Sequence, residues 1–402
     1  MSIDAMVLDA LLRQSLVTVR SLGRRELTVC AVATADRVPA FASRWCRAGF
    51  VFPEKEGSSA YLAALLELLE RTGARVLFSS HDGTIALLRE HRACLEQRVR
   101  LALASEPALT VAVNKERTLA VARRLGLNIP PQLVVRNAGE VVAALREVGL
   151  PAVVKPSESW LQQGDRGSWV GPELVVTPDE ARLAVEKVTE LGGAVMFQRF
   201  LAGRREAVSL LYSNGEVYAR FAQWARRTRP PLGGESVLRQ SIAIPPDIGP
   251  QAERLVREID IGGYSEVEFR RDSSGVPFLM EINARLSASV GIAVRAGVDF
   301  PHLLYQWASG ERIDRVDGYR VGGWMRHLGG DIDTTIMTLE QRGRPGITPP
   351  LQTVVAFGLS FLRPMAYDYV DWRDPGPAVR ASAEFSRDMM KRVDSRLRKV
   401  FS

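Results

Sequence analysis

Strand-like and helix-like segments alternate over the first hundred residues, and this alternation constrains the fold more than any other feature of the sequence. Residues 27–33 (LTVCAVA) and 75–79 (RVLFS) are short apolar runs rich in β-forming residues, whereas residues 60–71 and 81–90 follow helical spacing. Strands that alternate with helices are typical of a parallel sheet with crossover helices. No GxGxxG sequence follows the first of these strands, so no dinucleotide site is expected there. We predict a small α/β domain at the N-terminus.

The composition argues against several classes of protein. The formal net charge is +7, but the basic residues are scattered among Asp and Glu, so a nucleic-acid partner is not expected. The three cysteines show no CxxC spacing, which argues against a disulfide framework or a zinc site and favours a cytoplasmic location. The most apolar late stretch, residues 351–362, is about a dozen residues long, whereas a spanning helix needs roughly 20. No membrane partner is therefore expected.

The strongest indication of a functional site is a predicted hairpin. Residues 266–271 and 276–283 are strand-like and flank a Ser-Ser-Gly turn. Side chains two apart along a strand share a face, so Glu281 and Asn283 point the same way, and Glu268 joins them if the register permits. Two carboxylates and an amide oxygen suit Mg²⁺ that carries nucleotide phosphates. The alternative is a solvated surface hairpin, but the sequence PFLMEI is too apolar for that.

Basic residues and a glycine-bearing loop are candidates for a phosphate site. Lys155 ends an apolar strand (PAVVKP), and its compact charge suits phosphate oxygens, although a lysine that snorkels from the sheet end is the alternative. Lys115 opens a helix after the capping residue Asn114 and, taken alone, is better explained as an exposed first-turn lysine. Arg285 would lie beside the same phosphates. Backbone N–H groups of a loop suit phosphate oxygens, and the candidate loop contains Gly164, Gly167 and Ser168.

The segment MFQRFLAGRREAVSLLY, residues 196–212, offers a candidate nucleoside site. A strand that ends in Gln198 and runs into Leu201 presents backbone groups to an adenine edge, and Glu206 can accept hydrogen bonds from ribose hydroxyls. By itself the segment is an ordinary β-rich sequence.

Together, and in this order, these segments resemble the ATP-grasp superfamily, which includes biotin carboxylase and D-alanine–D-alanine ligase. The likeness covers about residues 105–310, and its most specific part is VEF followed by FLMEINAR. It implies an ATP-grasp fold of the α/β class (α+β in the ATP-binding core), preceded by a small Rossmann-like domain. The implied units are residues 1–105 (N-terminal α/β domain), 106–192 (central subdomain with the phosphate loop), 193–310 (C-terminal subdomain with the metal site) and 311–402 (C-terminal extension).

The same resemblance assigns metal and phosphate roles to individual residues. Glu268, Glu281 and Asn283 would hold Mg²⁺, for which Mn²⁺ can substitute. Arg285 would lie at the transferring phosphate of ATP. The implied phosphate contacts are Lys115, Lys155, Gly164, Gly167 and Ser168.

Nucleoside and substrate roles follow from the same resemblance. Gln198 and Leu201 would contact adenine, and Glu206 would contact the ribose. Arg239 stands where biotin carboxylase-like members place a basic residue near the acid substrate. Further candidates for that contact are Arg226 and Arg227.

The overall pattern is most similar to the stand-alone carboxylate–amine ligases of the superfamily. That likeness implies an enzyme that activates a carboxylate as an acyl phosphate with ATP and couples it to an amine, releasing ADP and phosphate. Its partners would be small-molecule carboxylate and amine substrates, and the sequence leaves a homo-oligomer open. Two alternatives are an ATP-grasp kinase or other phosphotransferase and a non-catalytic nucleotide-binding regulator. The set of Glu281, Asn283 and Arg285 argues against the regulator but does not separate ligase from kinase.

Overall fold

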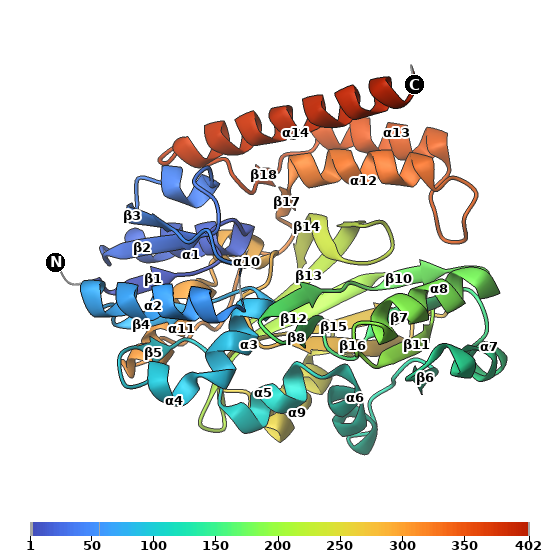
Figure 1. Ribbon diagram of the computed structural model, residues 1–402, viewed down its shortest axis with the longest axis horizontal. Helices are drawn as coiled ribbons and strands as arrows, with labels where there is room; N and C mark the ends of the chain where they lie inside the picture. Colours follow the sequence, from blue (N-terminus) through green and yellow to red (C-terminus); the bar gives the residue numbers. More distant parts are fainter. Residues whose placement is uncertain (1–2, 56, 401–402) are drawn as a thin grey trace.

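The N-terminal part is a five-stranded parallel sheet in the order β3-β2-β1-β4-β5, with helices on its faces (Figure 1). The computed structural model describes residues 3–55 and 57–400. The predicted α/β domain with a parallel sheet is confirmed, but its central strand was not predicted, since three residues are too few to show a periodic pattern. The elements are β1 (Ala5–Val7), α1 (Arg13–Gly23), β2 (Val29–Ala33), η1 (Pro39–Ala42), β3 (Cys46–Val51), α2 (Ser59–Thr72), β4 (Val76–Phe78), α3 (Asp82–Glu90), α4 (Arg92–Leu95) and β5 (Arg100–Leu101).

The middle of the chain forms a four-stranded sheet in the order β10-β7-β11-β6 and a separate hairpin of β8 and β9. One face of the sheet packs on α7 and α8 through an apolar cluster that includes Val154, Val185 and Phe197. The opposite face carries Lys155, because side chains alternate along a strand. The elements are α5 (Glu106–Ala112), α6 (Lys115–Arg124), β6 (Gln132–Val135), η2 (Ala138–Glu140), α7 (Val141–Val148), β7 (Ala152–Pro156), β8 (Trp160–Gln163), β9 (Arg166–Trp169), β10 (Glu173–Val175), α8 (Pro178–Thr189) and β11 (Val195–Arg199).

The third sheet has seven strands in the order β16-β15-β12-β13-β14-β17-β18. Helix α9 covers one of its faces, where Leu255 and Val256 pack with Val208 and Phe269. The last two strands come from the predicted C-terminal extension, so that segment continues the sheet. The elements are β12 (Arg205–Ser213), β13 (Glu216–Arg229), β14 (Glu235–Ile242), α9 (Gly249–Ile259), β15 (Gly263–Arg271), β16 (Pro277–Asn283), α10 (Val290–Ala296), α11 (Phe300–Ser309), β17 (Trp324–Arg326), α12 (Leu328–Glu340), α13 (Pro350–Leu359), η3 (Ser360–Leu362), β18 (Ala366–Tyr367) and α14 (Gly376–Val400).

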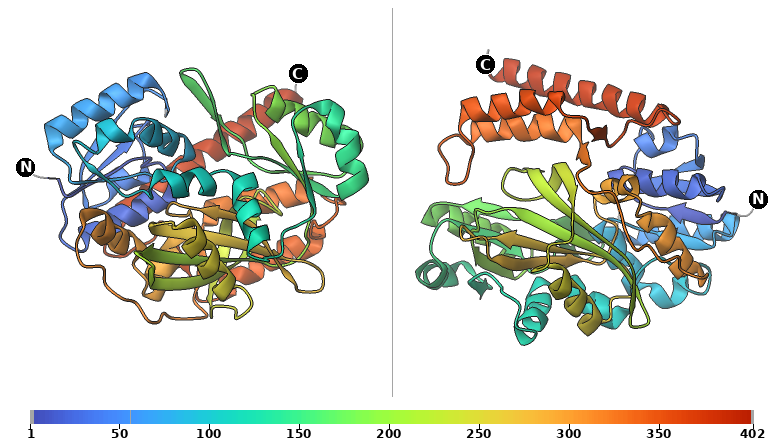
Figure 2. Two further views of the ribbon diagram at one scale, coloured as in Figure 1. Left: turned by 90° about the horizontal axis from the view of Figure 1, so that it is seen from below. Right: turned by 180° about the vertical axis from the view of Figure 1, so that it is seen from behind.

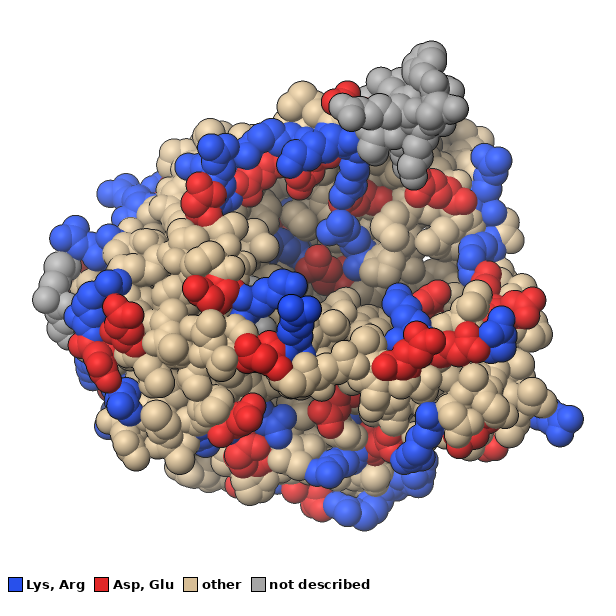
Figure 3. All heavy atoms as spheres, viewed as in Figure 1, with Lys and Arg blue, Asp and Glu red and all other residues tan. Residues whose placement is uncertain are grey.

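The C-terminal helices lie along one edge of the molecule. Helix α14 runs from η1 of the N-terminal domain to the pair of α12 and α13 (Figures 1 and 2). The face shown in Figure 3 is hollowed below these helices, and basic and acidic side chains are interspersed over it. Among the helices of the described residues, none combines the length and the apolar character needed to cross a membrane.

Candidate active site

The hairpin of β15 and β16 brings the three candidate metal ligands onto one face of the sheet. Glu268 lies directly opposite Glu281, and Asn283 lies opposite Glu266. A bulge after Glu268 leaves Met280 without a partner in the register. The Asn283 side-chain amide donates to Glu268 Oε1 at 3.2 Å. Opposite residues in an antiparallel pair have neighbouring side chains, so two carboxylates and one amide converge here.

The pKa values of the two glutamates shift in opposite directions. Burial raises the pKa of Glu268 to about 7, and the negative charge of Glu281 adds to the rise while Arg205 opposes it. Burial alone would also raise the pKa of Glu281, but Lys115 and Lys155 hold that pKa below its ordinary value. The different surroundings of these two adjacent carboxyl groups therefore give them different pKa values.

Both candidate lysines are buried beside these carboxylates. Lys155 Nζ donates to the Met280 carbonyl at 3.3 Å, and Lys115 Nζ donates to Ser159 Oγ at 3.0 Å. Burial and the nearby charge of Lys115 lower the pKa of Lys155 to about 8, although Glu281 opposes the shift. Lys115 is 8% exposed, so the alternative of a solvated first-turn lysine is wrong.

Arg285 pairs with an acidic residue of the N-terminal domain that the sequence analysis did not select. Its Nε donates to Asp82 Oδ1 at 2.6 Å. Burial disfavours the charged form of Asp82, but Arg285 nevertheless holds the pKa of that carboxyl below its usual value. Asp82 begins α3 just after β4, and the carboxyl ends of parallel strands are where such sheets bind ligands. The position of Asp82 directly after a predicted parallel strand is the sequence feature that could have marked it as a site residue.

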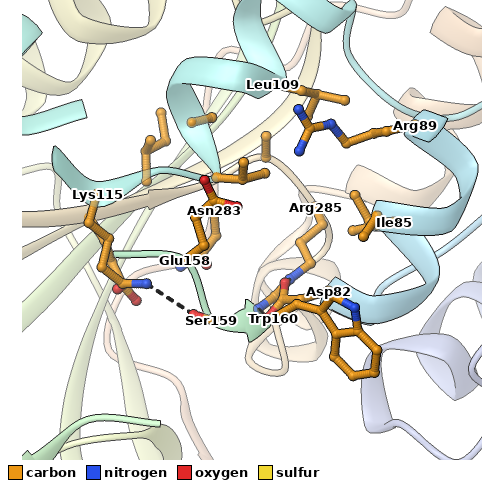
Figure 4. A pocket seen from close by; sticks show the side chains of 16 residues that line it. Asp82, Ile85, Arg89, Leu109, Lys115, Glu158, Ser159, Trp160, Asn283 and Arg285 are labelled. Carbon is orange, nitrogen blue, oxygen red and sulfur yellow. Dashed lines mark hydrogen bonds and ion pairs between the residues drawn. The ribbon is translucent and has the colours of Figure 1, made fainter. Parts of the chain in front are cut away.

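A cavity of about 80 Å³ lies next to these charged groups (Figure 4). Its polar side includes Lys115, Asn283 and Arg285, while Ile85 of α3 and Leu109 of α5 line the apolar side. A small molecule bound there would meet the phosphate-site candidates on one side and the N-terminal domain on the other.

Comparisons with known proteins identify the fold. A family model described as ATP-grasp in the biosynthetic pathway with Ter operon matches residues 193–322. The biotin carboxylase of Campylobacter jejuni, solved as a β-γ-ATP complex, superposes with a TM-score of 0.64 at 16% identity, covering 80% of this chain and 74% of that chain. An L-amino acid ligase from Bacillus licheniformis gives 0.58 at 19% identity, covering 77% and 75%. The chain has an ATP-grasp fold.

Curated relatives of this chain include D-alanine–D-alanine ligases. The enzyme of Geobacter sulfurreducens is 28% identical over 217 residues, which is 49% of this chain and 64% of the ligase. The enzyme of Methylococcus capsulatus is 26% identical over 271 residues, 63% of this chain and 83% of the ligase. The match to the first relative therefore spans slightly less than two thirds of that relative's length.

The loop predicted to contact phosphates is the hairpin of β8 and β9, which contacts the N-terminal domain. Trp169 Nε1 donates to Asp82 Oδ2 at 3.1 Å, and the Ser59 backbone N–H donates to Asp165 Oδ1 at 2.6 Å. A Cβ atom on Gly167 would lie 2.0 Å from the Trp160 ring, so this glycine allows the ring to pack. The other two loop candidates are Gly164, in the turn with φ +57°, and Ser168, paired with Leu161.

The three nucleoside candidates lie in different surroundings. Gln198 is fully buried in β11, where its Nε2 donates to Gln132 Oε1 at 2.8 Å, and Leu201 is buried just beyond that strand. Glu206 accepts from Arg271 Nε at 2.7 Å and from Arg204 Nε at 3.0 Å. The register places Glu206 opposite Phe269 and Ala207 opposite Glu268, so Glu206 faces away from the metal candidates. The structure does not bring the proposed ribose ligand to that face.

Arg239 does not reach the cavity either. It is completely buried, and its two Nη atoms donate to the two oxygens of Asp368 at 3.0 and 2.5 Å. This geometry does not support the predicted contact with an acid substrate, since Asp368 already fills the guanidinium fork. Of the two further candidates, Arg227 pairs with Asp331 at 2.5 Å, and Arg226 is exposed.

Proposed function

We propose that this protein is an ATP- and Mg²⁺-dependent ligase that activates a carboxylic acid as an acyl phosphate and couples it to an amine. The observation that carries the proposal is the shared face of β15 and β16, where Glu268, Glu281 and Asn283 lie beside Lys115 and Lys155. The curated relatives named D-alanine–D-alanine ligase and the structural neighbour named L-amino acid ligase support the same reaction class.

The residues on this face fit a divalent ion. Oxygen ligands are what Mg²⁺ prefers. The pKa of Glu268 is raised chiefly by burial and further by the charge of Glu281, and a bound cation would favour the charged carboxylate. Among the described residues no group of three or more His, Cys, Asp and Glu side chains could hold a metal. Asn283 and the phosphate oxygens of ATP would therefore complete the ligand set. A bound Mg²⁺ supplies a Lewis acid for the phosphoryl oxygens, and Mn²⁺ can substitute.

The proposed reaction has two steps. A carboxylate oxygen of the acid attacks the γ-phosphorus of ATP, the bond to the β,γ-bridging oxygen breaks, and ADP leaves. Lys115, Lys155 and Arg285 place cations where negative charge spreads over the phosphoryl oxygens. The amine then attacks the acyl carbon, phosphate leaves and the amine proton is released. Gln198 and Leu201 are the proposed adenine contacts.

The hairpin of β8 and β9 would protect the intermediate from water. Its contacts with Asp82 and Ser59 join it to the N-terminal domain beside the cavity. The proposed phosphate contacts Gly164, Gly167 and Ser168 belong to this hairpin. An acyl phosphate that is enclosed in this way reacts with a bound amine in preference to bulk water.

Trapping with hydroxylamine tests the proposal. The protein is incubated with ATP, Mg²⁺ and a panel of carboxylic acids, and acyl phosphate is measured as the hydroxamate. We expect ADP and hydroxamate in equal amounts with the right acid, and an amide when the right amine replaces hydroxylamine. Glu281→Gln, which removes one carboxylate charge, should lower the rate at least about 100-fold while the fold survives, as judged by circular dichroism.

Two results would contradict the ligase reaction. A phosphorylated product that is stable with every amine would identify a kinase. No ADP with any acid, together with normal nucleotide binding, would identify a regulator.

A further inference from the structure

Arg204, just before β12, and Arg205, the first residue of that strand, point to opposite faces of the third sheet. Arg204 pairs with Glu206 and stacks on the Trp224 ring, 4.2 Å from its centroid. Arg205 lies on the other face, where its Nε and Nη2 donate to Glu268 Oε2 at 2.9 and 2.5 Å. The second arginine therefore already occupies a carboxylate that the proposed function assigns to the metal.

The guanidinium of Arg205 is charged, and it donates hydrogen bonds to a carboxylate on one side and to a backbone carbonyl on the other. Burial disfavours its charge, but Glu268 and Glu281 raise the pKa of Arg205 above its ordinary value. Its Nη1 donates to the carbonyl of Gly234, in the loop between β13 and β14. The side chain therefore connects a proposed metal ligand to a loop.

A second cation lies directly opposite Arg205 in the register. Arg270 of β15 donates to the Leu232 carbonyl at 2.6 Å and rests over the Phe200 ring, 5.2 Å from its centroid. No carboxylate pairs with Arg270 within the described part of the chain. Burial and the charge of Arg205 lower the pKa of Arg270 to about 10. Like charges directly opposite on neighbouring strands repel each other, so this part of the face favours an anion.

We propose that Arg205 is a positioning residue that neutralises Glu268 until nucleotide binds and then turns to the nucleotide phosphates, which frees Glu268 for the metal. This inference rests on the proposed function. A guanidinium and a divalent ion compete for Glu268 Oε2, so metal binding without nucleotide requires that the ion pair be broken. Phosphate oxygens offer Arg205 a replacement partner, and by linkage each ligand then favours the other.

Binding of Mn²⁺, followed by electron paramagnetic resonance, tests the role of Arg205 without turnover. Wild type should bind Mn²⁺ weakly alone and at least about 10-fold more tightly with a non-hydrolysable ATP analogue. Arg205→Met should bind Mn²⁺ alone at least about 10-fold more tightly than wild type and lose most of the enhancement by the analogue. The matched control is Arg204→Met, one residue away on the other face, which should behave like wild type.

The possible outcomes separate this inference from the proposed function. If Arg205→Met shows the wild-type Mn²⁺ affinity and the wild-type enhancement, Arg205 has a purely structural role and the inference is wrong. If Arg205→Met does not fold, Arg205→Lys replaces it. A single ammonium holds Glu268 less well than a guanidinium fork, so Arg205→Lys should bind Mn²⁺ alone several-fold more tightly than wild type. An Mn²⁺ affinity of Arg205→Lys equal to that of wild type would overturn the inference. If wild type binds no Mn²⁺ even with the analogue, the proposed function itself fails.

Discussion

At the scale of single residues, the site is a set of mutually adjusted charges. Glu268 and Glu281 lie opposite each other, and nearby cations decide how each of them titrates. The pKa of the neighbouring Lys155 is lowered to about 8. A lysine with a pKa in this range changes charge near neutral pH, whereas a solvated lysine does not. The free protein thus has, at the proposed phosphate site, a cation whose charge is lost in mild alkali.

The affinity for ADP without divalent ions should fall as the pH rises through about 8. In the free protein Lys155 loses its charge across this range, and phosphate oxygens favour the ammonium form. Binding near pH 8 should therefore take up a proton, measurable by calorimetry in buffers of different ionisation enthalpy. Lys155→Arg keeps its charge and should bind with little dependence on pH between 7 and 9. A wild-type affinity that is constant over this range would show that Lys155 does not contact the phosphates.

At the scale of elements, the hairpin of β8 and β9 depends on its contacts with other elements. A two-stranded hairpin is marginal by itself, and this one is held by Asp82, Ser59 and the packing of Trp160. The Trp160 ring lies over Gly167 and makes an edge contact with the His81 ring, with 5.5 Å between the ring centroids. The position of the proposed phosphate loop therefore depends on a glycine and an aromatic ring as well as on its backbone.

Gly167→Ala should weaken nucleotide binding without unfolding the protein. The new methyl group would meet the Trp160 ring, and forced packing of this kind costs about 1–3 kcal/mol. If the hairpin loses its docking, affinity for an ATP analogue should fall about 10-fold in calorimetry. Arg166→Ala, an exposed position in the same hairpin, is the control and should keep the affinity of wild type. Equal affinity in both variants would mean that the docked hairpin makes no contribution to binding.

At the scale of the whole molecule, the C-terminal segment joins the N-terminal domain to the third sheet. Asp368 accepts from Arg239 of β14 and from Arg13 of α1, and all three side chains are buried. Asp374 accepts from Arg20 Nε at 2.9 Å, and Arg20 lies about two turns beyond Arg13 along α1. The final helix then continues over η1 (Figure 1). These pairs make the C-terminal segment part of the framework that joins the N-terminal domain to the sheet carrying the candidate active site.

Asp368→Asn should destabilise the protein by about 3–5 kcal/mol, because it leaves the buried guanidinium of Arg239 without its carboxylate and removes one of the two carboxylates that pair with buried Arg13. The free energy of unfolding in urea measures this loss. Asp371→Asn removes a pair with the partly exposed Arg24 and should cost at most about 1 kcal/mol. Equal losses in the two variants would show that burial of the Asp368 pair does not matter.

Local periodicity was enough to predict much of the fold and the central part of the candidate site. The alternation of strands and helices predicted the parallel N-terminal sheet, and the two-residue period of a strand placed Glu281 and Asn283 on one face. These predictions depend on neighbours only a few residues apart, so folding of the rest of the chain does not change them. The site roles themselves remain proposals.

Partners distant in the sequence were decided only by the tertiary structure. Arg285 meets Asp82 from 203 residues away, and Arg239 meets Asp368 from 129 residues away. No sequence period encodes these pairs, because strand order and domain packing bring the partners together. The register of β12 also decided that Arg205, rather than Glu206, faces Glu268. The sequence by itself determined which side chains of a strand share a face. Which of the two faces lies toward the site depends on the neighbouring strand and its register. A register shift of one residue would move every side chain of the strand to the opposite face.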